Sequence, residues 1–65
     1  MTFSEIERAL VKRAKAEHPK LAKGKGDWRV TSVWFEGDSV KAHIAYAEKR
    51  CTAYLNVTVG KSECL

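Results

Sequence analysis

The chain has 65 residues, of which 45% are hydrophobic and 31% charged, and its net charge is +4 at neutral pH. This length allows one small domain that buries only ~60% of its unfolded surface, so a large enclosed active-site cavity is not expected. The composition is too apolar for a disordered chain. No apolar run approaches the ~18 residues of a membrane-spanning helix, so we expect no membrane partner.

The start of the sequence and its cysteines bear on location and cofactors. No basic segment leads into an apolar run after Met1, so we expect no secretory signal and a cytoplasmic location. Cys51 and Cys64 are too few for a disulfide framework; we expect Cys51 in the apolar core and Cys64 exposed in a free tail. His18, His43 and the cysteines lack the clustered spacing of metal ligands, so we predict no metal and no other cofactor.

The first predicted element is a helix over residues 4–17. Thr2 and Glu5 have the spacing of a capping box. Apolar residues recur at steps of three and four and fall on one stripe, which we expect to face the core. These residues are Phe3, Ile6, Leu10 and Ala14. The residue before a proline avoids the α conformation, so His18-Pro19 is expected to end the helix.

Residues 18–27 are predicted to form a loop, since glycines interrupt it and lysines charge it. The predicted strands cover residues 28–35, 39–47 and 51–59. The clearest is 39–47, which alternates apolar and polar residues as a strand with one buried face does. Before it, Gly37 stands at the first central position of a two-residue turn, as a type II′ turn prefers. Residues 60–65 are predicted to be a flexible tail.

This order predicts an α+β fold, with a single N-terminal helix packed on a three-stranded antiparallel meander sheet (α-β-β-β). Residues 1–65 form one small α+β domain in this interpretation. The order is similar to the first part of the double-stranded-RNA-binding domain. That domain ends in a second helix, for which this sequence has no room after the last predicted strand, so no property of that family is transferred.

The turn chemistry predicts which side chains share a face of the sheet. A two-residue turn places Phe35 opposite Val40 and Thr31 opposite Ile44, which turns Phe35 and Val33 inward. The outward positions then form a surface rich in aromatic residues, which is typical of a contact site. These positions are Trp28, Val30, Trp34, Lys41, His43 and Tyr54. A three-residue loop would shift the register by one residue and place both tryptophans in the core.

The residues that could carry catalysis do not form a convincing site. Ser32, His43 and Tyr54 are predicted to form a row on the outer face, and a serine beside a histidine is an arrangement used in nucleophilic catalysis. No acid is placed to orient the histidine, and a flat sheet offers no oxyanion hole. The acidic residues occupy helix, turn and tail positions without an obvious acid/base pair. We therefore predict no catalytic residues and no enzyme activity.

Positive charge is concentrated in the first part of this small basic protein. Residues 1–29 hold eight Lys/Arg and four Asp/Glu, whereas residues 30–65 hold four of each. The residues predicted to contact nucleic acid are Arg8, Lys12, Lys15, Lys20, Lys23 and Lys25. Clustered positive charge attracts phosphate groups, and the predominance of lysine favours backbone contacts over base-specific readout. The alternative interpretation is a solvated helix face followed by a lysine-rich loop.

Two functions follow from these patterns. The first is a small non-enzymatic binding protein that binds DNA or RNA through the basic helix-and-loop surface. The second is a protein-binding accessory or inhibitor module, of the kind phages and mobile elements encode, that contacts a larger protein target through the aromatic sheet face. The partner-binding residues in that case are Trp28, Trp34, Lys41, His43 and Tyr54. A second copy of the chain, paired across the sheet as a homodimer, is a further candidate partner.

Overall fold

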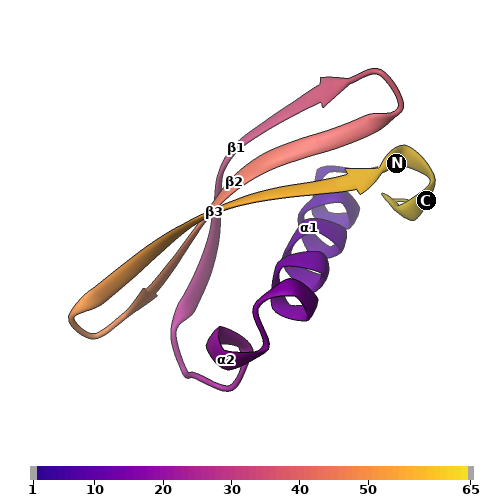
Figure 1. The fold of residues 1–65 in the computed structure, drawn as a ribbon. Coiled ribbons are helices and arrows are strands. Elements are labelled where there is room, and N and C mark those ends of the chain that lie inside the picture. The colour runs from indigo at the N-terminus through magenta and orange to yellow at the C-terminus, as the bar shows by residue number, and fades with distance from the viewer. Residues whose placement is uncertain (1, 65) are drawn as a thin grey trace.

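The computed structural model describes residues 2–64 and has the predicted α+β arrangement, a helix followed by a three-stranded antiparallel sheet (Figure 1). The helices are α1 (Phe3–Glu17) and the one-turn α2 (Pro19–Ala22). The strands are β1 (Asp27–Glu36), β2 (Ser39–Glu48) and β3 (Cys51–Gly60), and the 3-10 helix η1 (Lys61–Cys64) follows. The sheet order is β1-β2-β3, so β2 is paired on both sides as predicted. No helix within residues 2–64 is long and apolar enough to cross a membrane.

Helix α1 begins with the predicted capping box. The Thr2 backbone N–H donates to Glu5 Oε1 at 3.0 Å, and the Glu5 N–H donates to Thr2 Oγ1 at 3.3 Å. The hydrogen bonds from Thr2 lower the pKa of the Glu5 carboxyl group. The prediction that Phe3 lies in the core is wrong, since this side chain is 60% exposed. Side chains of a helix lean towards its N-terminus, so that of the first residue extends past the packed turns.

The segment after α1 is more regular than the predicted loop. His18 leaves the α conformation before the proline, as expected, and its N–H donates to Ala14 O at 2.9 Å. Pro19 then begins α2 at a first helical position, where its fixed φ is favourable and no N–H is needed. The loop proper is reduced to the few residues between Ala22 and β1.

The first hairpin has the predicted two-residue turn. Gly37 has a φ of +60°, which a glycine adopts without steric cost and which the first central position of a type II′ turn requires. Glu36 pairs with Ser39, and pairing stays regular from the turn as far as Ser32. The alternative three-residue loop is therefore wrong. Trp34 lies on the face of the sheet away from α1, as predicted.

In the first part of β1 the predicted register is wrong, because Thr31 is an extra residue in a β-bulge. Val30, and not Thr31, pairs with Ile44. The Thr31 hydroxyl donates to the backbone oxygen of His43 at 3.1 Å. The bulge reverses the alternation of side chains, so Trp28 and Val30 face α1 instead of lying outward.

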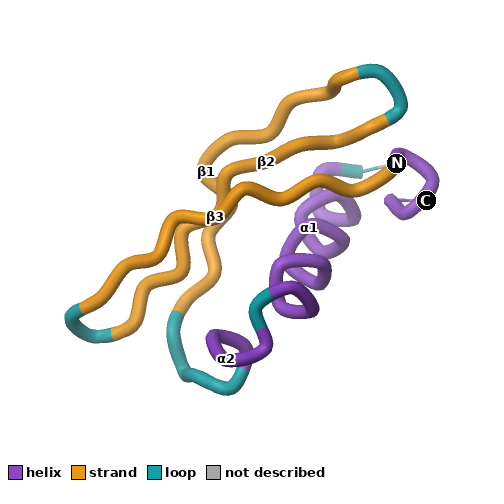
Figure 2. Tube along the Cα trace, viewed as in Figure 1, coloured by secondary structure: helices purple, strands orange, loops and turns teal. Residues whose placement is uncertain are grey.

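The hydrophobic core lies between α1 and one face of the sheet, while the opposite face carries no helix (Figures 1 and 2). The core residues are Ile6, Leu10, Ala14, Val40, Ala42, Ile44, Tyr46, Val57, Val59 and Cys64. Leu10 is fully buried and lies among the side chains of β2 and β3. We call the face covered by α1 the inner face and the opposite one the outer face.

Cys51 is exposed, which corrects the prediction that it lies in the core. The physical reason is length: each strand has 10 residues and extends ~33 Å at ~3.3 Å per residue, whereas the 15 residues of α1 extend only ~22 Å. The β2–β3 turn therefore projects beyond the helix (Figure 1), and Cys51 lies at this turn.

The segment predicted to be a flexible tail folds back onto the domain. Gly60 ends β3, and Lys61–Cys64 form η1, which contacts both α1 and β3. The Gly60 N–H donates to Glu63 Oε2 at 2.6 Å, and this places Cys64 in the core with only 2% of its surface exposed. The predictions of a free tail and of an exposed Cys64 are therefore wrong. Leu65, the last residue of that prediction, lies outside the described residues.

Candidate functional site

Three of the four basic side chains of α1 lie on the side of the helix away from the core. Arg8, Lys12 and Lys15 are exposed, whereas Leu10 and Ala14 on the opposite stripe are fully buried. At 1.5 Å of rise per residue, the three cations span about 10 Å along the helix axis. This arrangement presents a row of positive charges along one side of the molecule, as the sequence predicts.

Three further lysines, Lys20, Lys23 and Lys25, lie on α2 and the loop that follows it, and all three are exposed. The end of this loop is attached to the sheet. The Gly26 backbone N–H donates to the Tyr46 hydroxyl at 3.1 Å, and that hydroxyl donates to Glu48 Oε2 at 2.9 Å. The lysine-rich loop is therefore held at a defined position beside β2.

The close contact between loop and strand requires glycine. A Cβ atom on Gly26 would lie 2.5 Å from the backbone oxygen of Ala47 and 2.6 Å from Cζ of Tyr46, which is closer than real Cβ contacts. The Tyr46 side chain is almost completely buried under the loop, and this desolvation raises the pKa of its hydroxyl group. Tyr46 therefore stays protonated at neutral pH and keeps donating its hydrogen bond to Glu48.

Trp28 lies on the inner face of the sheet, whereas the sequence pattern predicted it on the outer face. Its ring lies 4.7 Å from the Tyr46 ring, between centroids. The ammonium group of Lys15 lies 6.0 Å from the centroid of the Trp28 ring, within reach of a cation–π interaction. Trp28 thus contacts Lys15 of the basic row and packs against the core. It does not lie beside Trp34 as a partner-binding residue of the outer face.

Within residues 2–64, the cations predicted to contact nucleic acid form no ion pair. Among the described residues, the ion pairs are Arg13 with Glu63 and Lys41 with Glu36. Neither includes one of the six residues predicted to contact nucleic acid. We call these six residues the basic surface: Arg8, Lys12, Lys15, Lys20, Lys23 and Lys25.

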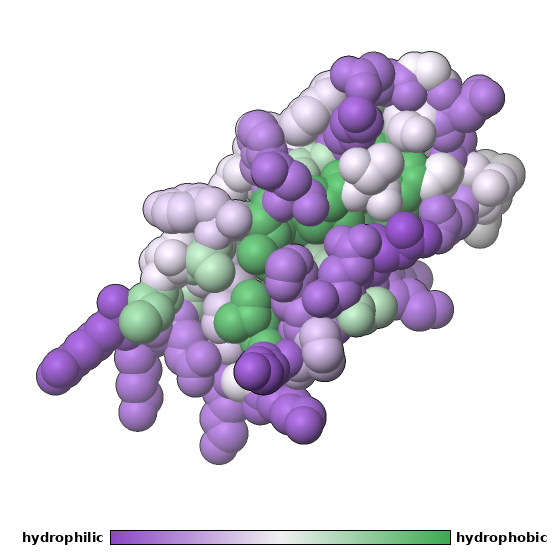
Figure 3. Space-filling view, viewed as in Figure 1, coloured by the Kyte–Doolittle hydropathy of each residue, from purple (hydrophilic) through white to green (hydrophobic). Residues whose placement is uncertain are grey.

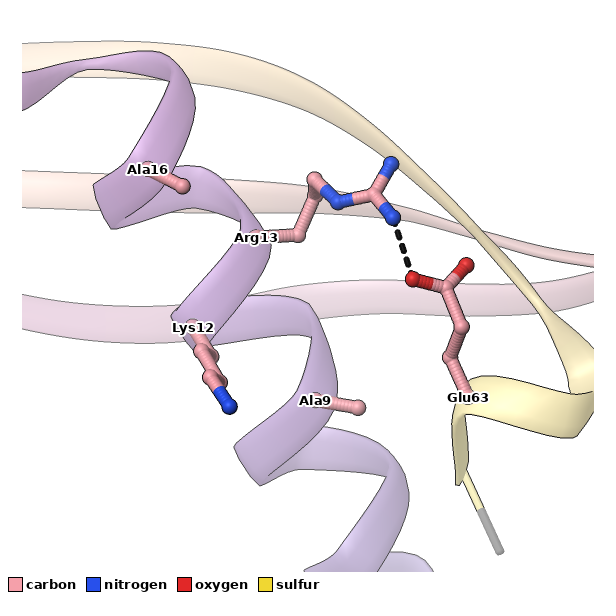
Figure 4. Close-up of a pocket in the computed structure, with 5 residues that line it drawn as sticks. All are labelled: Ala9, Lys12, Arg13, Ala16 and Glu63. Atoms are coloured by element: carbon pink, nitrogen blue, oxygen red, sulfur yellow. Dashed lines mark hydrogen bonds and ion pairs between the residues drawn. The ribbon is translucent and has the colours of Figure 1, made fainter.

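Arg13 has a structural role at the edge of this surface. Its guanidinium group binds Glu63 of η1 (Figure 4). It also donates to the backbone oxygen of Thr58 at 3.3 Å. The hydrogen bond from Gly60, together with Arg13, lowers the pKa of the Glu63 carboxyl group. A shallow hollow opens here between α1 and η1, with Ala9 and Ala16 as its small side chains. Its one arginine is already paired, and Lys12 lies on its rim (Figure 4).

The surface in Figure 3 shows how hydrophilic and hydrophobic residues are distributed over one side of the molecule. Apolar side chains are visible in the middle of this view, and hydrophilic side chains surround them and extend from the end near α2 and the β2–β3 turn. The exposed lysines of α2 and its loop belong to that end.

The outer face carries the remaining residues predicted to bind a partner. Trp34 is 36% exposed, and its ring meets the His43 ring edge-on, with centroids 4.9 Å apart. Tyr54 on β3 is 82% exposed. Lys41 forms an ion pair with Glu36, which lowers the pKa of that carboxyl group. Without Trp28, this face is less aromatic than predicted.

The row of side chains around His43 also differs from the prediction. Ser32 lies opposite His43 as expected, but the third member of the row is Asn56, because Tyr54 pairs with Ala45. The row therefore consists of a hydroxyl, an imidazole and an amide. Within residues 2–64, no three His, Cys, Asp or Glu side chains come together in the arrangement of a metal site.

Comparisons of the chain with models of protein families, with curated proteins and with solved structures find no match.

Sequence reasoning missed the residues that position these surfaces. Thr31 forms the bulge, Tyr46 anchors the lysine-rich loop, and Arg13 fastens η1 to α1. One signal was present: Val30 and Val33 are both apolar but three residues apart, which breaks strict alternation and is typical of a bulge between them. Tyr46 and Arg13 gave no comparable signal, because their partners are distant in sequence.

Proposed function

We propose that this protein binds nucleic acid through the phosphate backbone, using the basic surface. The observation that carries this proposal is that all six cations are exposed and that none forms an ion pair within the described residues. A cation without a carboxylate partner is available to replace the counterions of a phosphate, which drives association. The attachment of the loop to Tyr46 supports the proposal, since held charges lose less freedom on binding.

The chemistry of the basic surface favours backbone contacts over base readout. Five of its six residues are lysines, which act as point charges, whereas the planar fork of arginine suits guanine edges. Binding at this surface should therefore depend strongly on salt and little on sequence. The proposed role is that of a non-enzymatic binding protein.

The protein-binding alternative has less support. It relied on two tryptophans standing together, but Trp28 faces α1 and Trp34 faces away from it. The outer face retains Trp34 and Tyr54, separated by the polar side chains of His43 and Asn56. Cores of protein interfaces are more apolar than this.

The test measures the affinity of the protein for a short duplex DNA of mixed sequence at several salt concentrations. The slope of log K against log salt should approach about −0.9 for each phosphate contact, and so about −5 if all six cations take part. The triple variant Lys12→Glu, Lys15→Glu, Lys23→Glu should lose binding while its circular dichroism spectrum stays unchanged, because these side chains are exposed.

A matched control makes the same change in net charge elsewhere. The variant Lys49→Glu, Arg50→Glu, Lys61→Glu alters exposed residues outside the basic surface. It should retain most of the affinity. Equal losses in both triple variants would show that only overall charge matters, and absence of binding by the wild type at low salt would refute the proposal.

A further inference from the structure

The outer face of the sheet has two hollows, one on each side of the His43 ring. The first lies between Trp34 and β3, and Lys41 and Thr58 contribute to its lining. The second lies beside Tyr54. His43 and Asn56 line both hollows, so the two are adjacent, with Trp34 in the lining of one and Tyr54 in the lining of the other.

The pairing of the strands sets the separation of these two aromatic residues. Trp34 lies opposite Lys41 and Tyr54 lies opposite Ala45, so four residues of β2 and two strand spacings separate them. At ~3.3 Å per residue and ~4.8 Å per strand, their Cα atoms are about 16 Å apart. His43 stands midway on this diagonal. The distance suits an extended ligand with several flat groups better than a single small molecule.

The charge of this face suits an anionic ligand. Its central outward positions carry the cations Arg29 and Lys41 and the polar ring of His43, and the other positions between them carry hydroxyl, amide or small apolar groups. Glu36, at the turn end, is already bound to Lys41. Asp27 lies at the opposite end of β1, and the centre of the described outer face holds no carboxylate.

We propose that the outer face binds unpaired bases of a single-stranded nucleic acid, with one base stacked on Trp34 and another on Tyr54. Aromatic side chains stack with any base, and the Asn56 amide and neighbouring hydroxyl groups provide hydrogen bonds to base edges. This inference rests on the proposed function for its ligand class and adds a surface that contacts bases. Lys25 and Arg29 are four residues apart, so the basic loop and the outer face meet at the start of β1.

Two other occupants fit the face less well. A second copy of the chain would bring the cations Arg29 and Lys41 of each copy towards those of the other, which is unfavourable. A protein partner would leave the polar groups between Trp34 and Tyr54 to be desolvated in the middle of the interface. Bases meet both requirements, because their faces are apolar and their edges are polar.

The test compares labelled oligothymidylate with a duplex DNA of equal length, using fluorescence anisotropy. Trp34→Ala and Tyr54→Ala should each weaken binding of oligothymidylate by about tenfold or more, as loss of one stacking contact does. Binding of the duplex should change less than about twofold, because its bases are already stacked and paired. Tyr54→Phe keeps the ring and should bind oligothymidylate as the wild type does.

The matched control is Phe35→Ala, which removes an aromatic side chain that is 56% exposed but belongs to the inner-facing set of β1. It should leave both affinities unchanged. Wild-type affinity of Trp34→Ala and Tyr54→Ala for oligothymidylate would overturn the inference. So would a dimer of the free protein, seen by sedimentation equilibrium, that Trp34→Ala dissociates, since the occupant would then be a second copy.

The two proposals fail in different ways. If the triple reversal of the basic surface abolishes duplex binding but Trp34→Ala has no effect on oligothymidylate, only the inference about the outer face fails. If Trp34→Ala weakens binding but the triple reversal does not, only the basic surface fails. A wild-type protein that binds neither polymer at low salt would overturn both.

Discussion

Trp28 and Trp34 lie on the same strand, six residues apart, and yet they face opposite sides of the sheet. In a regular strand an even separation places both side chains on one face. The bulge at Thr31 adds one residue between them, so Trp28 packs against Tyr46 on the inner face and Trp34 against His43 on the outer face. One irregular residue thus divides the aromatic residues of β1 between structure and surface.

The two tryptophans have different surroundings on the two faces of the sheet. Trp28 packs against the hydrophobic core and lies under the ammonium group of Lys15. Trp34 contacts His43 within the sheet and lies on the outer face. Trp28 therefore contributes to the packing of the core and contacts Lys15, whereas Trp34 is the ring that we propose for ligand contact.

The largest expected effect is a difference in stability between variants of the two tryptophans. Trp28→Ala should lower the free energy of unfolding by about 2–3 kcal/mol, because it removes a large half-buried ring from the core. Trp34→Ala should lower it by about 1 kcal/mol or less, since its cross-strand contact with His43 is open to water. Urea unfolding of both variants, followed by circular dichroism, measures the difference.

Single-tryptophan variants provide a check that does not depend on stability. Trp34→Phe leaves Trp28 as the only indole, and Trp28→Phe leaves Trp34. Iodide should quench Trp34 more readily than Trp28. Equal stability losses together with equal quenching would contradict the assignment of the two rings to opposite faces.

A smaller effect is expected at the bulge itself. Thr31→Val keeps the size of the side chain but removes the hydroxyl group that donates to His43 O. The loss should be about 1 kcal/mol, as for an intramolecular hydrogen bond, and thermal unfolding can measure it. Thr52→Val, on the exposed part of β3, is the matched control and should change the stability by less than about 0.5 kcal/mol.

The smallest expected effect is the loss of stability at low pH. It involves one carboxylate on each side of the sheet, Glu63 and Glu36. The pKa of Glu63 is lowered, first by the N–H of Gly60, and that of Glu36 by Lys41. A carboxyl group with a lowered pKa in the folded state stabilises the protein above its unfolded pKa, and this contribution is lost as the pH falls through the folded pKa. Stability should therefore decline as the pH is lowered below about 4.5, the ordinary value.

Glu63→Gln and Glu36→Gln should each flatten part of this decline, and the double variant should show the sum of the two effects, because the two sites share no partner. Urea unfolding at a series of pH values measures it. Both groups are exposed, so the effects are modest. A double variant with the same acid dependence as the wild type would show that neither contact persists in solution.

Much of the fold was accessible to sequence reasoning because it depends on contacts between near neighbours in the chain. The capping box of Thr2 and Glu5, the helix end before Pro19 and the turn at Gly37 each involve residues within a few positions of one another. The alternation in 39–47 predicts its inner face for the same reason. The basic surface was also predictable, since charges on a helix and in a loop are rarely buried.

The remaining features depended on tertiary structure because they join residues far apart in the sequence. The spacing of Val30 and Val33 hints at a bulge, but only their packing against the core beneath α1 shows that both face inward and that Thr31 is the extra residue. Cys64 is buried where η1 packs against α1, and Arg13, fifty residues away in the sequence, binds Glu63 of η1 there. In each case the free energy comes from a contact between distant segments, and only the folded chain brings those segments together.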